Sequence, residues 1–293
     1  MPGSDARELT AQVPRRANGR LANVVGVDLR EGNFSESNLR GAFFFFADLS
    51  LTNLSNAELE GGTLVGCDLT RANAQGANFA GSNLCRTNLT ETNLTGANLR
   101  KVALVEAILS STVLTAADLL SMMACAARLD SAIMEGATFR LADLSQCVFQ
   151  NCRGNMANFE RASLFSTQWS DCVVEDGNFE FADLRNAVFT RCWFGRSCFV
   201  GAVLEGAQFI ECDLTGADFY WSDFDNSKCF GCELRDIRRP EEPKIAYGPK
   251  GVKPPVVIPK PLYRQAITEE ERQKLLASCL EPPSKTTESE PKK

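Results

Sequence analysis

The sequence predicts an all-β fold, a right-handed quadrilateral parallel β-helix of about ten coils. Three observations support this prediction. Forty-two consecutive five-residue units run from Val27 to Asp236 in one unbroken frame. A longer period of 20 residues is superimposed on that frame, and proline is absent from Arg15 through Arg239 although the chain has 12 prolines. Together these features indicate one elongated repeat domain with short additions at both ends.

Each unit carries a large apolar residue at its centre, and 35 of the 42 centres are Leu or Phe. The residue two places earlier is Ala 19 times and Cys seven times, and the residue between them is Asn or Asp 20 times. A period of five matches neither an α-helix at 3.6 nor a plain strand at 2, so the chain has to turn once per unit. In a short extended segment, the small residue and the centre point inward and the Asn or Asp points outward.

Residues that recur every 20 positions indicate how many units close one coil. They are Cys152, Cys172, Cys192, Cys212 and Cys232, and Phe139, Phe159, Phe179, Phe199 and Phe219. Because like residues stack when coils superimpose, four units make one coil and the cross-section is a square. At a strand spacing of ~4.8 Å the rod is on the order of 50 Å long, and its connections are expected to be right-handed. Proline is excluded from such a ladder because it has no N–H to donate.

Three centres, Ala74, Ala124 and Gly154, lack a large side chain and are expected to be weak points of the core. We expect Met134 to lean into the space above Gly154, because a flexible thioether chain fills irregular gaps. The defect predicts a packing adjustment and no ligand.

The frame is clearest in Ala97-Asn98-Leu99, Ala142-Asp143-Leu144, Ala182-Asp183-Leu184 and Ala217-Asp218-Phe219. These units resemble the A(D/N)LXX motif of the pentapeptide-repeat family. The resemblance implies a right-handed quadrilateral β-helix. It implies no single activity, because the family includes acidic rods that resemble duplex DNA and bind type II topoisomerases, modules appended to signalling domains, and many proteins of unknown role.

The repeat divides the chain into three segments, and the second and third differ in charge. Residues 1–21 form an N-terminal extension, and this extension or a partner is expected to cap the open stack of coils. Residues 22–236 form the β-helix and carry 15 Lys or Arg against 27 Asp or Glu, a net charge of −12. Residues 237–293 carry 12 basic against eight acidic residues, a net charge of +4. An acidic rod repels phosphate, so we expect no direct nucleic-acid binding by the β-helix.

The basic C-terminal segment holds seven prolines between Pro240 and Pro261, which predicts an extended arm. Thr268 and Glu271 make a capping box, which predicts a short helix near residues 269–280. The oligomeric state, and whether this arm packs on its own rod or on another chain, are left open by the sequence.

The apolar runs and the cysteine positions of the chain predict the cellular compartment in which it works. It has no run of 18 apolar residues, and Met1–Arg20 lacks the apolar core of a signal peptide, so no membrane span is expected. Seven of the 12 cysteines occupy the small inward position of the repeat, which favours buried, reduced thiols over a disulfide or metal ladder. We therefore expect the cytoplasm, another reducing intracellular compartment, or a cytoskeletal or organellar assembly.

No catalytic residue, metal site or cofactor is predicted. Histidine is absent, which removes the commonest general base and metal ligand. The Asn and Asp residues recur in columns along the outside of a regular rod, where a solvated or corner-bonding role accounts for them without a cleft. The sequence therefore argues against an enzyme.

Most outward positions of the repeat are polar, and the apolar residues found at outward positions are the candidate partner-binding residues. One group follows the centres of a single side of the coil and forms an apolar column expected to be exposed; a second group is aromatic and lies in the C-terminal half. The first group is Phe45, Val65, Cys85, Val105 and Cys125, flanked by Phe43, Phe46 and Met123. The second is Trp193 with Val173, then Tyr220, Trp221 and Phe181.

The function predicted from these observations is a non-catalytic protein–protein interaction scaffold or structural subunit that uses its faces and C-terminal arm. The alternative is an acidic DNA-mimic rod that binds a type II topoisomerase. The charge of −12 favours this alternative, and the basic proline-rich C-terminus disfavours it. A third reading, an enzyme or metal protein that uses the cysteines, is the weakest of the three.

Overall fold

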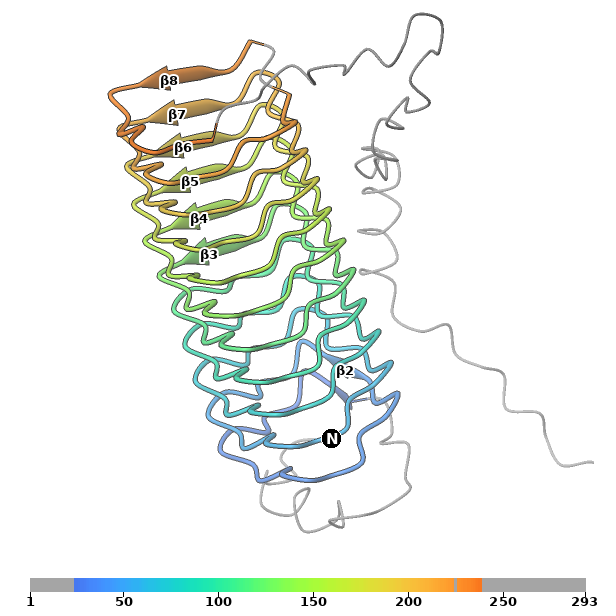
Figure 1. The fold of residues 1–293 in the computed structure, drawn as a ribbon. Helices are drawn as coiled ribbons and strands as arrows, with labels where there is room; N and C mark the ends of the chain where they lie inside the picture. The colour runs from blue at the N-terminus through green and yellow to red at the C-terminus, as the bar shows by residue number, and fades with distance from the viewer. Residues whose placement is uncertain (1–23, 224–225, 239–293) are drawn as a thin grey trace, which may run out of the picture.

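The computed structural model describes residues 24–223 and 226–238, which form one parallel β-solenoid (Figure 1). The predicted N-terminal extension, residues 1–21, lies outside the described part. So do the predicted helix near residues 269–280 and the arm, apart from its first two residues. The fold class predicted from the repeat is confirmed.

The parallel bridges and strand pairs join residues that are 20 positions apart. The parallel register begins at Val24 with Phe44 and continues to Asp218 with Arg238. Four units therefore close one coil. We name the four sides by the centres they contain: face 1 takes every twentieth residue from Leu29, face 2 from Phe34, face 3 from Leu39 and face 4 from Phe44.

Two sets of short paired strands form part of this ladder. Isolated parallel bridges with the same register make up the rest of it. On face 4, β1 (Val24–Val25) pairs with β2 (Phe44–Phe45). On face 1, six strands pair in chain order, β3 to β8 (Figure 1). They are β3 (Arg128–Asp130), β4 (Val148–Gln150), β5 (Gln168–Ser170), β6 (Val188–Thr190), β7 (Gln208–Ile210) and β8 (Lys228–Phe230).

The chain turns at the residue two places after each centre. Every described residue at this position from Gly26 to Asp236 has a positive φ, and 12 of them are glycine. At most corners the next small residue closes the turn, as where Ser82 N donates to Phe79 O at 3.0 Å. A positive φ at the third residue of a closed four-residue turn defines type II geometry. The unit therefore consists of a short extended segment and one tight corner.

A reciprocal pair of corner substitutions tests this geometry. Gly96 has a φ of 64°, and a Cβ added there would have no atom within 4 Å, so Gly96→Ala is expected to cost about 1 kcal/mol through backbone strain alone. Ala116 occupies the same corner one coil later with a φ of 54°. Ala116→Gly is therefore expected to stabilise the fold by up to about 1 kcal/mol. Urea unfolding midpoints measure both changes, and two shifts of the same sign would contradict the assignment.

The inward side chains form one continuous hydrophobic core along the rod. On face 3, adjacent phenylalanine rings stack with centroids 4.7 to 4.9 Å apart and planes within 8° of parallel. On face 1, Trp169 stacks on Phe149 with centroids 3.7 Å apart, and its indole N–H donates to Thr167 Oγ1 at 3.0 Å. The coil spacing equals an aromatic stacking distance, so a phenylalanine period of 20 residues produces a continuous ring column.

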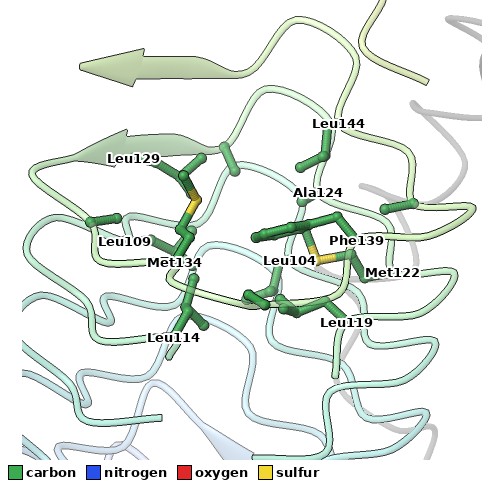
Figure 2. Packing of buried hydrophobic residues seen from close by; sticks show 14 of the residues in the cluster. Leu104, Leu109, Leu114, Leu119, Met122, Ala124, Leu129, Met134, Phe139 and Leu144 are labelled. Atoms are coloured by element: carbon green, nitrogen blue, oxygen red, sulfur yellow. The ribbon is translucent and has the colours of Figure 1, made fainter. Parts of the chain in front are cut away.

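The predicted adjustment at Gly154 is confirmed. Met134 is fully buried, and its Cε lies 3.3 Å from the position that a Gly154 Cβ would occupy. Figure 2 shows Met134 among Leu114, Leu109 and Leu129. A flexible side chain from the coil below thus fills the space that the missing centre leaves.

The seven cysteines at the small inward position are free thiols, and six of them are buried. Cys152 Sγ donates to the Leu129 carbonyl oxygen at 3.1 Å. The hydrogen bond with the neighbouring thiol and burial raise the pKa of Cys172 to about 12, and the pKa of Cys192 is raised to about 12 in the same way. At neutral pH these side chains are protonated thiols that pack as small apolar groups.

Candidate interaction surfaces

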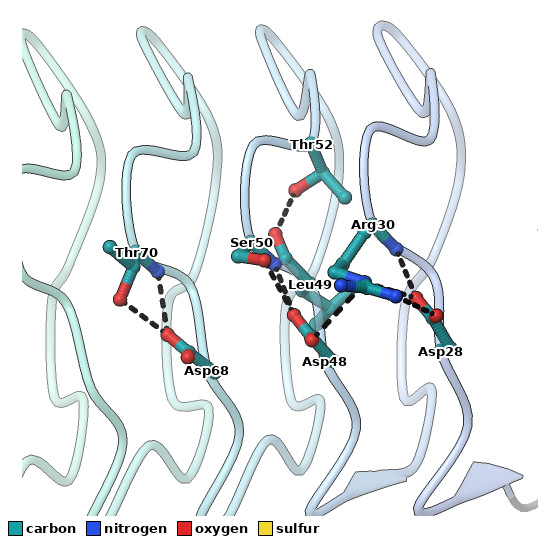
Figure 3. A network of polar contacts seen from close by, with 8 residues as sticks. All are labelled: Asp28, Arg30, Asp48, Leu49, Ser50, Thr52, Asp68 and Thr70. Atoms are coloured by element: carbon teal, nitrogen blue, oxygen red, sulfur yellow. Dashed lines mark hydrogen bonds and ion pairs between the residues drawn. The ribbon is translucent and has the colours of Figure 1, made fainter.

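The Asn or Asp before each centre has a local structural role. At 19 of the described units its side-chain oxygen accepts the backbone N–H of the residue two places later. In Figure 3, Asp68 Oδ1 accepts Thr70 N at 2.9 Å and also the Thr70 hydroxyl. This bond satisfies a backbone donor at the start of each turn, as in an Asx turn. It gives these Asn and Asp side chains a structural role at the corner.

Arginine and carboxylate side chains pair between neighbouring coils along the corners. Arg71 Nε contacts Glu91 at 2.7 Å, and Arg191 Nε contacts Asp171 at 2.7 Å. Hydrogen bonds between the partners lower the pKa of Glu91 and Asp171 and raise the pKa of both arginines. Such exposed pairs contribute little to stability. They place positive charge between the acidic groups of the rod.

The described residues hold no group of three His, Cys, Asp or Glu side chains that is placed to bind a metal ion. Across residues 24–223 and 226–238, no helix has the length and apolar character that a membrane crossing needs.

The expected exposure of the apolar column on face 4 is wrong: Phe45, Val65, Cys85, Val105 and Cys125 are all buried, and Val65 has no exposed surface. The column belongs to a hydrophobic cluster separate from the core. The cluster contains Phe45, Val65, Cys85, Ala103 and Val105, with Phe43 and Met123 partly buried against it. A sequence period gives the direction of a side chain relative to the core and does not show what lies beyond it. The side chains face away from the core and are nevertheless buried.

Phe46 is exposed, unlike the cluster next to it. It occupies a corner with a φ of 50°, and its ring lies against Gly66, where an added Cβ would be 2.5 Å from the ring. Phe181 lies against Gly201 in the same way. Glycine at these corners therefore makes room for the aromatic ring of the preceding coil.

The predicted aromatic group falls into two places. Tyr220 and Trp221 stack with ring centroids 4.8 Å apart at the corner between faces 3 and 4. The Arg238 guanidinium lies 4.0 Å from the Tyr220 ring centroid, a cation–π distance. Trp193 lies on face 2, and 43% of its surface is exposed. The structure therefore separates Trp193 from the other two aromatic residues.

Sequence reasoning missed most of an apolar column on face 2. Val113, Ile133, Arg153, Val173 and Trp193 occupy the same outward position in five successive coils and pair in register. Val113 and Val173 are half-buried, and Ile133 and Trp193 are exposed. The signal was present in the sequence, since the four apolar residues share one position of the frame at multiples of 20. We call this set the face 2 column.

These features define the class of protein: a parallel β-solenoid whose polar groups are held in local bonds and whose faces present columns of side chains. A sequence profile described as pentapeptide repeats matches in eight copies, in segments that together span residues 20–121 and 199–228. A second profile, described as a pentapeptide repeat region, matches residues 121–199. The chain belongs to the pentapeptide repeat family.

Solved structures of several pentapeptide repeat proteins are similar to this chain. HetL, a protein involved in heterocyst differentiation regulation from the cyanobacterium Nostoc sp., is 22% identical with a TM-score of 0.36, covering 81% of this chain and 94% of its own. QnrB1, a plasmid-mediated fluoroquinolone resistance protein, is 23% identical with a TM-score of 0.40, covering 60% and 88%. No curated protein sequence matches the chain. The likenesses concern the fold.

Proposed function

We propose that the protein is a non-catalytic scaffold that binds a protein partner through the face 2 column. The observation that carries the proposal is the column of outward side chains at one position of five successive coils, in which Ile133 and Trp193 are exposed and Val113 and Val173 are half-buried. Five positions at ~4.8 Å spacing make a strip about 20 Å long. Tryptophan and arginine are the residue types that most often dominate binding energy at protein interfaces, and Arg153 lies in the middle of the strip.

The rigidity of the rod favours this use. The backbone on both sides of Ile133 is held in the ladder, with Ile133 N donating to Thr112 O at 2.9 Å and Met134 N donating to Arg153 O at 2.6 Å. Side chains on a fixed backbone lose less conformational freedom when they bind. Phe46, Tyr220 and Trp221 are further candidate contacts at the corners.

The alternative function, mimicry of duplex DNA toward a type II topoisomerase, is favoured by the net charge of −12. A DNA mimic presents unneutralised carboxylates in stripes, and here arginines such as Arg71, Arg86 and Arg191 pair with acidic groups one coil away. A supercoiling assay with gyrase and the purified chain tests this function directly. Inhibition at stoichiometric protein would favour mimicry over the scaffold.

A charge placed in the face 2 column tests the scaffold. Ile133→Glu is expected to weaken partner capture at least about ten-fold, because it removes an exposed apolar side chain from the strip and places a carboxylate next to Arg153, which lies one coil away in register. Partners are identified by affinity purification with cross-linking, followed by quantitative mass spectrometry, and one captured protein is then purified for direct titration.

Ile108→Glu is the matched control. Ile108 occupies the same position of the unit on face 1, and its exposure of 42% is close to the 36% of Ile133. Equal binding by wild type and Ile108→Glu, with loss in Ile133→Glu and in Trp193→Glu, supports the proposal. Equal loss in Ile108→Glu and Ile133→Glu, or no loss in either, would contradict it.

A further inference from the structure

Face 4 differs from the other three faces in the burial of its outward side chains. The residues directly before and after each centre point outward. Within residues 24–223 and 226–238, ten of these outward side chains are buried, and all ten lie on face 4. They are Phe45, Val65, Cys85, Ala103, Val105, Cys125, Ser145, Ser163, Asp183 and Val203. The burial continues along nearly the full length of the face.

Stacking of the coils does not account for this burial. Every outward side chain has neighbours in the coils above and below, and the other three faces have the same stacking. Val200 on face 3 occupies the same position of its unit as Val65, directly after the centre, and it is only half-buried. Val65 and Cys85 have no exposed surface. The stacked neighbours are Phe45 and Cys85 for Val65, and Glu180 and Tyr220 for Val200. Because the neighbours of Val200 are similarly large and leave it half-buried, the full burial of Val65 points to a further layer over face 4.

The outward side chains of face 4 change character along the rod. The positions on either side of the centres carry no charge from Phe43 to Cys125. From Asp143 to Asp223 the same positions hold four acidic residues and one arginine, a net charge of −3. The occupant of this face should therefore have an apolar part and a basic part, arranged in that order from the N-terminal coils toward the C-terminal ones.

We propose that the occupant is the C-terminal segment of the same chain, with residues 269–280 as a helix on the apolar half of face 4. In a helix, Leu275, Leu276, Cys279 and Leu280 share one side. Twelve residues make a helix about 18 Å long. The column from Phe45 to Cys125 spans four coil spacings, about 19 Å. The apolar side of the segment thus matches the column in length and character.

The intervening arm fits the acidic half. It leaves the rod after Arg238, at the C-terminal coils, and residues 239–263 carry five basic and two acidic residues, a net charge of +3. At the inter-coil spacing, Arg238 lies about 27 Å along the rod from the Cys125 coil, and 25 residues in a polyproline conformation reach about 75 Å. The arm therefore has the length and the charge to run back along face 4 and deliver the helix to the column.

Hydrogen–deuterium exchange on the full-length chain tests the proposal. The amides of residues 269–280 are expected to exchange slowly in the wild type, because a free helix of this length is marginal in water and a docked one is protected. Val65→Asp is expected to speed that exchange at least about ten-fold by placing a carboxylate under the helix. Val200→Asp, the same change at the same unit position on face 3, is expected to leave it unchanged.

A variant in the segment keeps the test independent of the rod. Leu276→Asp is expected to release the helix and to expose Cys85 and Cys125, so that iodoacetamide labels both thiols, as read by mass spectrometry. Ser278→Asp, on the opposite side of the helix, is the control and should leave both thiols protected.

Three outcomes would overturn the proposal: fast exchange of residues 269–280 in the wild type, equal effects of Leu276→Asp and Ser278→Asp, or protection that falls on dilution and so indicates a second copy. Circular dichroism checks the fold of each variant. If Val65→Asp disrupts the rod, the Leu276→Asp and Ser278→Asp pair still decides the question. The face 2 column lies on another side, so failure of this proposal leaves the proposed function untouched.

Discussion

Phe179→Ala is expected to lower the free energy of unfolding by about 3–5 kcal/mol. Phe179 is fully buried in the middle of the face 3 ring column, with Phe159 stacked at 4.9 Å on one side and Phe199 at 4.8 Å on the other. Its ring also meets Trp169 edge-on at 6.4 Å. Alanine would remove these ring contacts and leave a cavity. The regular ladder on both sides limits how far the coils can relax into it.

Phe181→Ala is the matched control, two residues away. Phe181 is a corner residue at the surface, where the Arg161 guanidinium lies 5.7 Å from its ring centroid, so its loss is expected to cost less than about 1 kcal/mol. Urea unfolding followed by circular dichroism measures both variants. Similar losses for Phe179→Ala and Phe181→Ala would contradict the assignment of an inward and an outward ring.

Ile108→Pro is expected to destabilise the rod by about 3 kcal/mol or more. Ile108 N donates to Thr87 O at 3.1 Å, in the ladder between coils. Proline would remove that donor and direct its ring toward the carbonyl oxygen below. Each coil contacts only its neighbours, so one broken bridge weakens the interface of two whole coils.

Ser110→Pro is the control within the same unit. Ser110 follows the centre and contributes its carbonyl oxygen to the ladder, as acceptor for Glu91 N at 2.8 Å. It also occupies the second position of the turn, where proline is favoured in type II geometry. We expect Ser110→Pro to change the unfolding free energy by less than about 1 kcal/mol. A thermal unfolding scan measures both variants. If Ser110→Pro melts at as low a temperature as Ile108→Pro, the backbone N–H of Ile108 has no special role in the ladder and the prediction is wrong.

Much of the fold could be predicted because the same residue pattern recurs in every unit of the repeat. The five-residue frame gives the inward and outward positions, and the 20-residue recurrence of residues such as Phe139 and Phe159 gives the register that the structure has. Even the adjustment of Met134 at Gly154 was predictable, because a missing centre in one coil leaves a space that only a stacked neighbour can fill. Every such prediction depends on residues that share a unit or stack at the fixed spacing of 20.

The surface was harder to predict for a specific reason. Val65 and Ile133 are both aliphatic and both lie at outward positions, and one is fully buried while the other is exposed. Val65 follows its centre on face 4, and Ile133 precedes its centre on face 2. Neither of these differences in the frame determines by itself how exposed a side chain is. Exposure depends on what else packs against a face, and the five-residue frame does not contain that information. The five-residue frame therefore predicted partner-binding residues on face 4 that are buried, and it did not predict Val113 and Ile133 on face 2.

The sequence by itself determined the square solenoid, its 20-residue register and the inward set of Leu, Phe, Ala and Cys, because a local period acts identically in every coil. Only the tertiary structure decided three features: the left-handed conformation at every described corner, which backbone N–H each Asn or Asp side chain accepts, and the difference between the buried outward side chains of face 4 and the more exposed ones of face 2. The first two follow from closing a coil of four short segments, which requires a tight turn and leaves an outward N–H to be satisfied. The third follows from burial, which depends on the whole molecule and which no repeat unit encodes.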